Sequence, residues 1–162
     1  MSIDKEIILS ASDVEVEFAV RGRKLKAIRR ISIDLYKNET LAIVGESGSG
    51  KSVTAYSIMQ ILADTGKVVE GEILFKGQNI LDYSKKEMDA FRGKKVSIIF
   101  QDPMTSLNPT FTIGWQLREA VQLHTEDKTK KQANKRAIEL LEMVGVKEPE
   151  SRIKQYPLEL FG

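Results

Sequence analysis

The stretch GESGSGKS, from Gly45 to Ser52, decides the fold of this chain. It fits the pattern G-x-x-x-x-G-K-[ST], in which a glycine-rich loop joins a strand to a helix and holds phosphate groups. The neighbouring sequence supplies that setting, because the apolar run TLAIV at 40–44 precedes the loop and a run with helical periodicity at 51–62 follows it. A flexible Gly/Ser turn is the alternative, and it would need no such setting. We therefore predict a strand, a phosphate-binding loop and a helix, in that order.

The chemistry of phosphate binding explains the residue types in the loop. Glycines permit backbone angles and a close approach that a Cβ would prevent, so that successive N–H groups can point at phosphate oxygens. The start of the helix adds the positive end of its dipole. The ammonium group of Lys51 is expected to reach the β- and γ-phosphates, and the hydroxyl of Ser52 to ligate Mg²⁺. The residues of the loop predicted to bind nucleotide are Gly45, Ser47, Gly48, Ser49, Gly50, Lys51, Ser52 and Val53.

Length and composition limit the other possibilities. A chain of 162 residues is long enough for one domain with a core, and its net charge of +2 is too small to indicate a nucleic-acid partner. The chain has no cysteine, which excludes disulfides and thiolate metal sites. We see neither a signal peptide nor a run approaching the roughly 20 apolar residues that span a bilayer. Any work at a membrane would therefore need another chain to do the spanning.

Hydrophobic periodicity predicts strands before the loop and helices toward the end of the chain. The basic segment at 21–30 between the first two strands is expected to be a solvated hairpin, with a phosphate or nucleic-acid patch as the alternative. SKKE at 84–87 has the spacing of a capping box. The expected strands are 13–18, 31–35, 40–44, 71–77 and 96–100, and the expected helices are 51–62, one from Ser84 through Phe91, one from Thr112, and one that ends at Gly145.

Two other classes of phosphate-loop protein fit the sequence poorly. A small GTPase should carry Asp-x-x-Gly and Asn-Lys-x-Asp, but DPMT at 102–105 lacks the glycine and NKRA at 134–137 lacks the aspartate. A small kinase would need a basic lid. The segment KTKKQANKR at 128–136 has the charge for a lid, but it opens an amphipathic helix. A small kinase remains an alternative, although the predicted helix argues against it.

The segment VSIIFQDPMTSLNP at 96–109 resembles the Q-loop of the ATP-binding subunits of ABC transporters, in the oligopeptide, dipeptide and nickel importer branch. VGESGSGKSV, GEILFKGQNIL, FTIGWQLREA and ELLEMVGV are similar to the same branch, so the resemblance covers nearly the whole chain. It implies an α/β fold: a P-loop NTPase core with an N-terminal antiparallel β subdomain and the start of an α-helical subdomain. The implied domains are a nucleotide-binding core at 1–100 and a Q-loop with helical subdomain at 101–162.

The resemblance also implies roles for single residues, with ATP and Mg²⁺ as cofactors. Gln101 would lie near Mg²⁺ and the attacking water, and an ordinary glutamine at the end of a strand is the alternative. Phe18 would stack on adenine, with core packing as the alternative. Asp102 belongs to the Q-loop by this alignment and is not the Mg²⁺ aspartate. His124 is expected to be a packing residue at the edge of the core.

Two hydrophobic groups in the last third of the chain also receive a prediction. Trp115 and Met104 are expected to pack rather than to touch a cofactor. Met104 and Leu107 are candidates for the surface that receives a membrane subunit.

The last residues, YPLELFG at 156–162, resemble the start of the family's signature motif, with Phe161 where the family has serine. The Walker B aspartate, the catalytic glutamate and the switch histidine would follow that motif. We therefore expect the C-terminal half of the core to be absent from this chain, which would leave at most weak ATP binding, little or no hydrolysis, and exposed apolar surface and sheet edges.

The function implied is that of an ATP-binding subunit that energises an importer of peptides or related small solutes. Its partners would be membrane-spanning permease subunits and a second ATP-binding subunit, in a homodimer or a heterodimer, at the cytoplasmic face of the membrane. The alternative is a non-catalytic binding or regulatory module, or the product of a decayed gene, that docks to transporter subunits.

Overall fold

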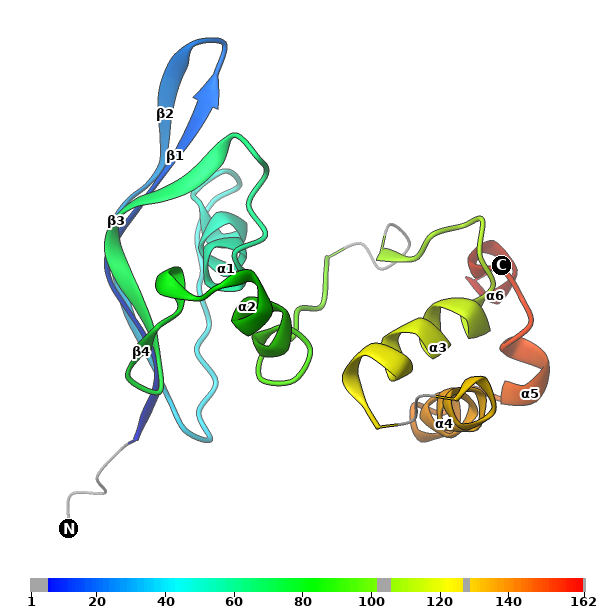
Figure 1. Cartoon of the computed structure of the whole chain (residues 1–162). Helices are drawn as coiled ribbons and strands as arrows, with labels where there is room; N and C mark the ends of the chain where they lie inside the picture. Colours follow the sequence, from blue (N-terminus) through cyan, green and yellow to red (C-terminus); the bar gives the residue numbers. More distant parts are fainter. Residues whose placement is uncertain (1–5, 102–105, 127–128, 162) are drawn as a thin grey trace. The chain divides into compact units, whose positions relative to one another are not determined.

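The structure is a computed structural model that describes residues 6–101, 106–126 and 129–161. The chain divides into two compact units, Met1–Ser97 and Ile98–Gly162. Figure 1 shows a sheet with helices in the first unit and helices in the second. Each unit is built around a hydrophobic cluster of its own.

The first unit is built on a four-stranded antiparallel sheet of order β2-β1-β3-β4. Its strands are β1 (Ile7–Val20), β2 (Arg23–Tyr36), β3 (Gly66–Phe75) and β4 (Gln78–Asn79). The turn between β1 and β2 places Arg21 and Gly22 at φ of 50° and 77°, as a tight two-residue hairpin turn requires. The antiparallel β subdomain and the basic hairpin predicted from the sequence are both confirmed.

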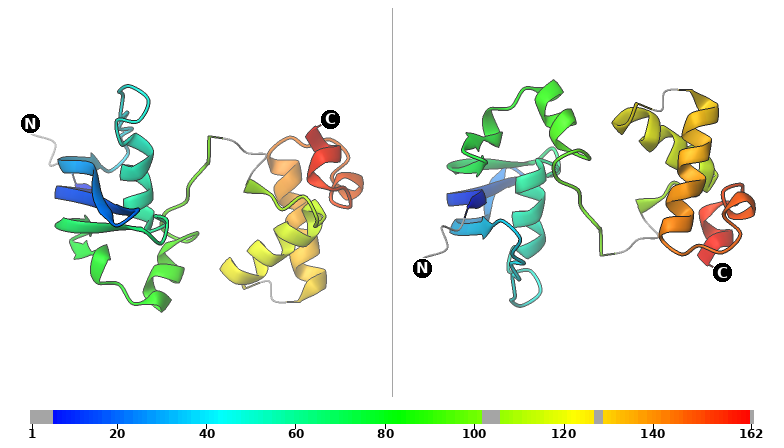
Figure 2. Two further views of the ribbon diagram at one scale, coloured as in Figure 1. Left: turned by 90° about the horizontal axis from the view of Figure 1, so that it is seen from above. Right: turned by 90° about the horizontal axis from the view of Figure 1, so that it is seen from below.

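Two helices pack on one face of this sheet and close the first core. Figures 1 and 2 show α1 (Lys51–Met59) and α2 (Lys85–Phe91) on the same side of the strands. A short 3-10 helix, η1 (Ile80–Asp82), joins β4 to α2. The capping box predicted at the start of α2 is present, since the Ser84 hydroxyl accepts from the Glu87 N–H and the Glu87 carboxylate accepts from Ser84 N–H. The core contains Val14, Val16, Ile28, Ile73, Ile80, Met88 and Phe91.

A buried carboxylate ties three strands together. Glu15 of β1 is 6% exposed, and its two oxygens accept from Lys26 Nζ at 2.7 Å and from Arg30 Nε at 3.2 Å. Arg30 also donates to Glu70 of β3 at 3.2 Å. The hydrogen bond from Lys26 is the main reason that the pKa of Glu15 is lowered, so this carboxylate stays charged and paired. The cluster fixes β2, which runs beside the phosphate loop.

Two predicted strands do not form, and these predictions were wrong. The segment at 40–44 has no strand pairing, and Val44 is 88% exposed. The segment at 96–100 makes only an isolated bridge, between Val96 and Arg92, and Ile99 is 95% exposed. A strand is stabilised by a hydrogen-bonded neighbour, and within the described residues neither segment has one. Most of their apolar side chains are exposed, whereas Val96 is partly buried against the core of the first unit.

The second unit consists of helices around a small core. They are α3 (Ile113–His124), α4 (Lys130–Met143), α5 (Pro149–Arg152) and α6 (Pro157–Phe161). Both predicted long helices are confirmed, and they pack through Ile113, Ala137, Leu141 and Ile153. The start of α3 is bound to the segment after α5, because Gly114 N donates to Ile153 O at 2.7 Å.

Three side chains of the second unit test the packing predictions. His124 is exposed at the last position of α3, so the packing role predicted for it was wrong. Trp115 stacks on Phe111 with ring centroids 4.2 Å apart, and Leu107 packs against the core of the unit. Met104 lies outside the described residues. In the part of the chain that the structure describes, no helix has the length and apolar character needed to cross a membrane.

Candidate nucleotide-binding site

The glycine-rich segment forms a tight loop that ends at the first residue of α1. Gly48 and Gly50 adopt φ of 81° and 97°, angles that residues with a Cβ rarely adopt. Gly50 also lies against β2, since a Cβ at this position would be 3.2 Å from Ala27 O. The strand and the helix therefore fix the loop from two sides, and glycine is needed at its junction with the helix.

The side chain of Lys51 folds back over the loop. Its Nζ donates to the carbonyl oxygens of Gly45 at 2.8 Å and Glu46 at 2.7 Å, and lies 3.4 Å from Ser49 Oγ. The ammonium group is thereby held beside the backbone that the motif uses for phosphate. An anion with several oxygens can compete for this group, because a lysine donates three hydrogen bonds and can turn toward a new acceptor.

The residues after the lysine divide between solvent and core. Ser52 is exposed in the first turn of α1, so its hydroxyl is open to a ligand, whereas Val53 packs against the core of the first unit. Mg²⁺ in nucleotide sites typically takes one or two protein oxygens and completes its shell with phosphate and water. An open hydroxyl beside Lys51 fits that requirement. Among the described residues no group of three or more His, Cys, Asp or Glu side chains could hold a metal ion.

Sequence reasoning missed two residues that hold the two ends of α1, the helix that follows the loop. Thr54 is buried, and both its N–H and its hydroxyl donate to Gly50 O, at 2.9 and 3.1 Å, which secures the first turn of α1. Arg92 holds the other end of the helix, because its guanidinium donates to Met59 O at 2.8 Å and to Gln60 O. A threonine four residues after the last glycine of the loop was a usable signal for Thr54. No local pattern points to Arg92, which is distant in sequence.

Phe18, the predicted adenine contact, lies in β1 and is half-buried. Its ring covers Gly66 of β3, where an added Cβ would lie 2.4 Å from Phe18 Cε1, and it packs against the core of the first unit. These contacts are those of the packing alternative, and they leave part of the ring exposed. The stacking role stays a prediction.

Gln101 and the C-terminal motif belong to the second unit, whereas the loop belongs to the first. Gln101 is exposed, and Asp102 directly after it lies outside the described residues. The approach of Gln101 to Mg²⁺ stays a prediction. At the other end, Tyr156 N donates to Glu159 Oε2 at 2.8 Å and Pro157 is buried at the start of α6. The side chain of Phe161, where the family has serine, is not among those described.

The loop, its lysine and the strands and helix around it define a phosphate-loop nucleotide-binding protein. The profile of the ABC transporter family matches residues 28–161, and this chain belongs to that family. The match includes the loop, the Q-loop segment and the helices of the second unit.

Similar proteins agree with this assignment. The chain is 49% identical over 158 residues to the dipeptide transport ATP-binding protein DppD of Bacillus subtilis, covering 97% of this chain and 47% of the relative. It is 49% identical over 156 residues to the oligopeptide transport ATP-binding protein OppD of the same organism, covering 96% and 43%. The dimeric structure of a bacterial ABC transporter cassette has a TM-score of 0.75 at 22% identity, covering 93% of this chain and 62% of that chain.

These comparisons confirm the α/β fold of the ABC ATPases that the resemblance implied. The chain spans about half the length of the curated relatives it matches.

Proposed function

We propose that this chain provides the nucleotide-binding part of an ATP-binding subunit that energises an importer for peptides or related small solutes. The observation that carries the proposal is the glycine loop with Lys51 held over its carbonyl groups at the start of α1. Relatives named as dipeptide and oligopeptide transport ATP-binding proteins, each 49% identical to this chain, supply the solute class.

In the proposed mechanism the residues of the loop bind and orient the phosphates of ATP. Gly48 and Gly50 let backbone N–H groups turn toward phosphate oxygens, and the dipole of α1 favours the negative charge. Lys51 leaves the carbonyls of Gly45 and Glu46 to reach the β- and γ-phosphates. Bound Mg²⁺ would neutralise developing charge on the phosphates, and Ser52 is the residue that would hold it.

Two residues outside the loop complete the proposed site. Gln101 would orient water and share in binding Mg²⁺, and an amide suits this task because it accepts and donates without adding a charge. Phe18 would offer the exposed part of its ring to adenine. We propose residues 1–100 as the nucleotide-binding core and residues 101–162 as the Q-loop and helical subdomain.

The proposed partners are permease subunits, which would dock at the Q-loop and the helical subdomain, and a second ATP-binding subunit. The subunit would work at the cytoplasmic face of the membrane. These proposals rest on the family and on the names of the relatives.

Substitution in the chromosomal gene tests the proposed function. Lys51→Ala should abolish uptake of a radiolabelled dipeptide by the cell, while Lys94→Ala, an exposed lysine outside the loop, should leave uptake unchanged. The transport role would be contradicted if the purified Lys51→Ala protein no longer binds ATP while the strain that carries it takes up the dipeptide normally. Release of phosphate by the purified protein would distinguish an ATPase from a non-catalytic binding module.

A further inference from the structure

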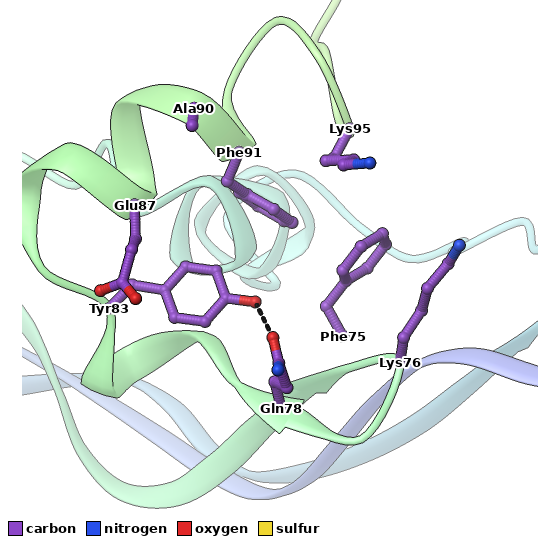
Figure 3. A pocket seen from close by; sticks show the side chains of 8 residues that line it. All are labelled: Phe75, Lys76, Gln78, Tyr83, Glu87, Ala90, Phe91 and Lys95. Atoms are coloured by element: carbon purple, nitrogen blue, oxygen red, sulfur yellow. Dashed lines mark hydrogen bonds between the residues drawn. The ribbon is translucent and has the colours of Figure 1, made fainter.

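The first unit contains a hollow that lies away from the phosphate loop. It has a volume of about 330 Å³ and lies between the turn that joins β3 to β4 and the helix α2. Figure 3 shows its side chains as sticks. The volume is at the lower end of the range for sites that bind small molecules. None of its side chains belongs to the candidate nucleotide site.

A row of three aromatic rings forms the floor of the hollow. Phe91 is the middle ring, with its centroid 5.1 Å from that of Phe75 and 5.9 Å from that of Tyr83, and both contacts are edge-on. Phe91 is only 3% exposed, and the Tyr83 hydroxyl donates to Gln78 Oε1 at 3.2 Å. The floor is therefore an apolar surface whose rings are held in place by their neighbours.

Opposite charges border the two ends of this row. Figure 3 shows Lys76 and Lys95 on the side of Phe75, and Glu87 on the side of Tyr83. The Lys76 ammonium lies 5.8 Å from the centroid of the Phe75 ring. Neither lysine lies within ion-pair distance of a described carboxylate, although the charge of Lys76 contributes to the lowered pKa of Glu6.

Glu87 is already held in position by the start of its own helix. Its Oε2 accepts from Ser84 N at 2.8 Å and from Ser84 Oγ at 2.6 Å. These hydrogen bonds lower the pKa of Glu87, so the carboxylate is ionised at neutral pH. A carboxylate can accept about four hydrogen bonds, so Glu87 retains capacity for a cationic ligand. Because the Glu87 side chain is already held, little of its conformational entropy remains to be lost when a cationic ligand binds.

We propose that this hollow binds tripeptides that have free termini and an aromatic or large aliphatic side chain. The peptide carboxylate would face Lys76 and Lys95, the terminal ammonium would face Glu87, and the side chain would lie on the aromatic row. Ring-to-ring steps of 5.1 and 5.9 Å separate the two outer rings of the row by at most about 11 Å. Three extended residues cover about 10–11 Å, so a tripeptide can place its termini at both ends, whereas two residues cover only about 7 Å. A single amino acid carries both charges on one Cα and cannot.

Titration of the isotope-labelled chain with the tripeptide alanyl-phenylalanyl-alanine, followed by amide NMR shifts, tests the proposal. The tripeptide should give saturable shifts confined to residues 75–95. Its N-acetylated form, its C-terminal amide and free phenylalanine should each bind about fivefold more weakly, as expected for loss of one exposed charge contact. Triglycine, which has no side chain for the aromatic row, should give no saturable shift.

Variants separate the charged contacts from the fold. Glu87→Gln keeps a residue suited to the capping box, and Lys76→Gln with Lys95→Gln removes the cationic end; both should weaken binding about fivefold. Lys86→Gln, on α2 outside the hollow, is the matched control and should bind like the parent chain. Shifts outside 75–95, or no saturation, would overturn the proposal. A peptide that is both N-acetylated and C-amidated completes the test. Equal binding of this doubly blocked peptide would show a docking surface for an internal protein segment, and would also overturn the proposal.

Discussion

At the scale of single residues, the site depends on backbone geometry as much as on side chains. Gly50 has φ of 97°, and a Cβ added to it would lie 3.2 Å from Ala27 O. Its carbonyl oxygen accepts two hydrogen bonds from Thr54. The motif predicted that glycine is needed here and that Lys51 and Ser52 follow it. It could not predict Ala27 or Arg92, because their contacts join segments that are distant in sequence.

Gly50→Ala should weaken ATP binding and also destabilise the fold. A Cβ at positive φ costs about 1–2 kcal/mol, and displacement of the loop would remove backbone donors from the phosphates, for a loss of about tenfold in affinity. Gly77→Ala is the matched control, since Gly77 has φ of 80° with nothing within 4 Å of an added Cβ and lies in the turn between β3 and β4. Its stability should fall similarly, with ATP affinity unchanged. Calorimetric titration and denaturant unfolding measure the two effects, and equal ATP affinity in all three proteins would refute the argument.

At the scale of elements, local patterns predicted the helices and the antiparallel strands but failed where pairing is required. The capping box of α2 and the hairpin of β1 and β2 formed as expected, because their signals lie within a few residues. The apolar segments at 40–44 and 96–100 have the composition of strands, but neither joins a sheet within the described residues. Helix α1 ends at Met59, three residues earlier than predicted, because Gln60 adopts a left-handed conformation at φ of 47°.

Arg92→Gln should loosen the contact between α2 and the end of α1. Loss of charge-assisted hydrogen bonds to Met59 O and Gln60 O should lower the free energy of unfolding by about 1–3 kcal/mol. Arg29→Gln is the control, since the side chain of Arg29 is exposed on β2 and makes no hydrogen bond or ion pair within the described part of the chain. Urea unfolding followed by far-UV circular dichroism measures both. An Arg92→Gln protein as stable as the control would show that the guanidinium contributes nothing.

Gly114→Ala should destabilise the second unit although alanine favours helices. An added Cβ would lie 2.6 Å from both the carbonyl oxygen and Cγ1 of Ile153, and such overpacking costs about 1–3 kcal/mol. The only tryptophan, Trp115, reports on this helix by fluorescence. Glu119→Ala, at an exposed position of α3, should unfold like the parent chain. A Gly114→Ala protein with an unchanged or higher midpoint would contradict the close contact.

At the scale of the whole molecule, the family follows from a loop and its setting rather than from composition. Net charge, length and absence of cysteine excluded classes without selecting one. The match at 28–161 and the likeness to a solved cassette agree with the class that the loop indicated. The proposed solute class rests on similarity alone, because no residue described in the nucleotide site would touch a solute in the proposed role.

The affinity of the 162-residue chain for Mg-ATP, with and without Lys51, tests the central claim most directly. Titration with a fluorescent ATP analogue should show saturable binding that unlabelled ATP displaces, weakened at least about tenfold in Lys51→Ala and unchanged in Lys94→Ala. Folding of each variant is checked by circular dichroism. Binding of equal strength in the folded parent chain and in folded Lys51→Ala, or no displaceable binding in the parent chain, would contradict a phosphate site at this loop.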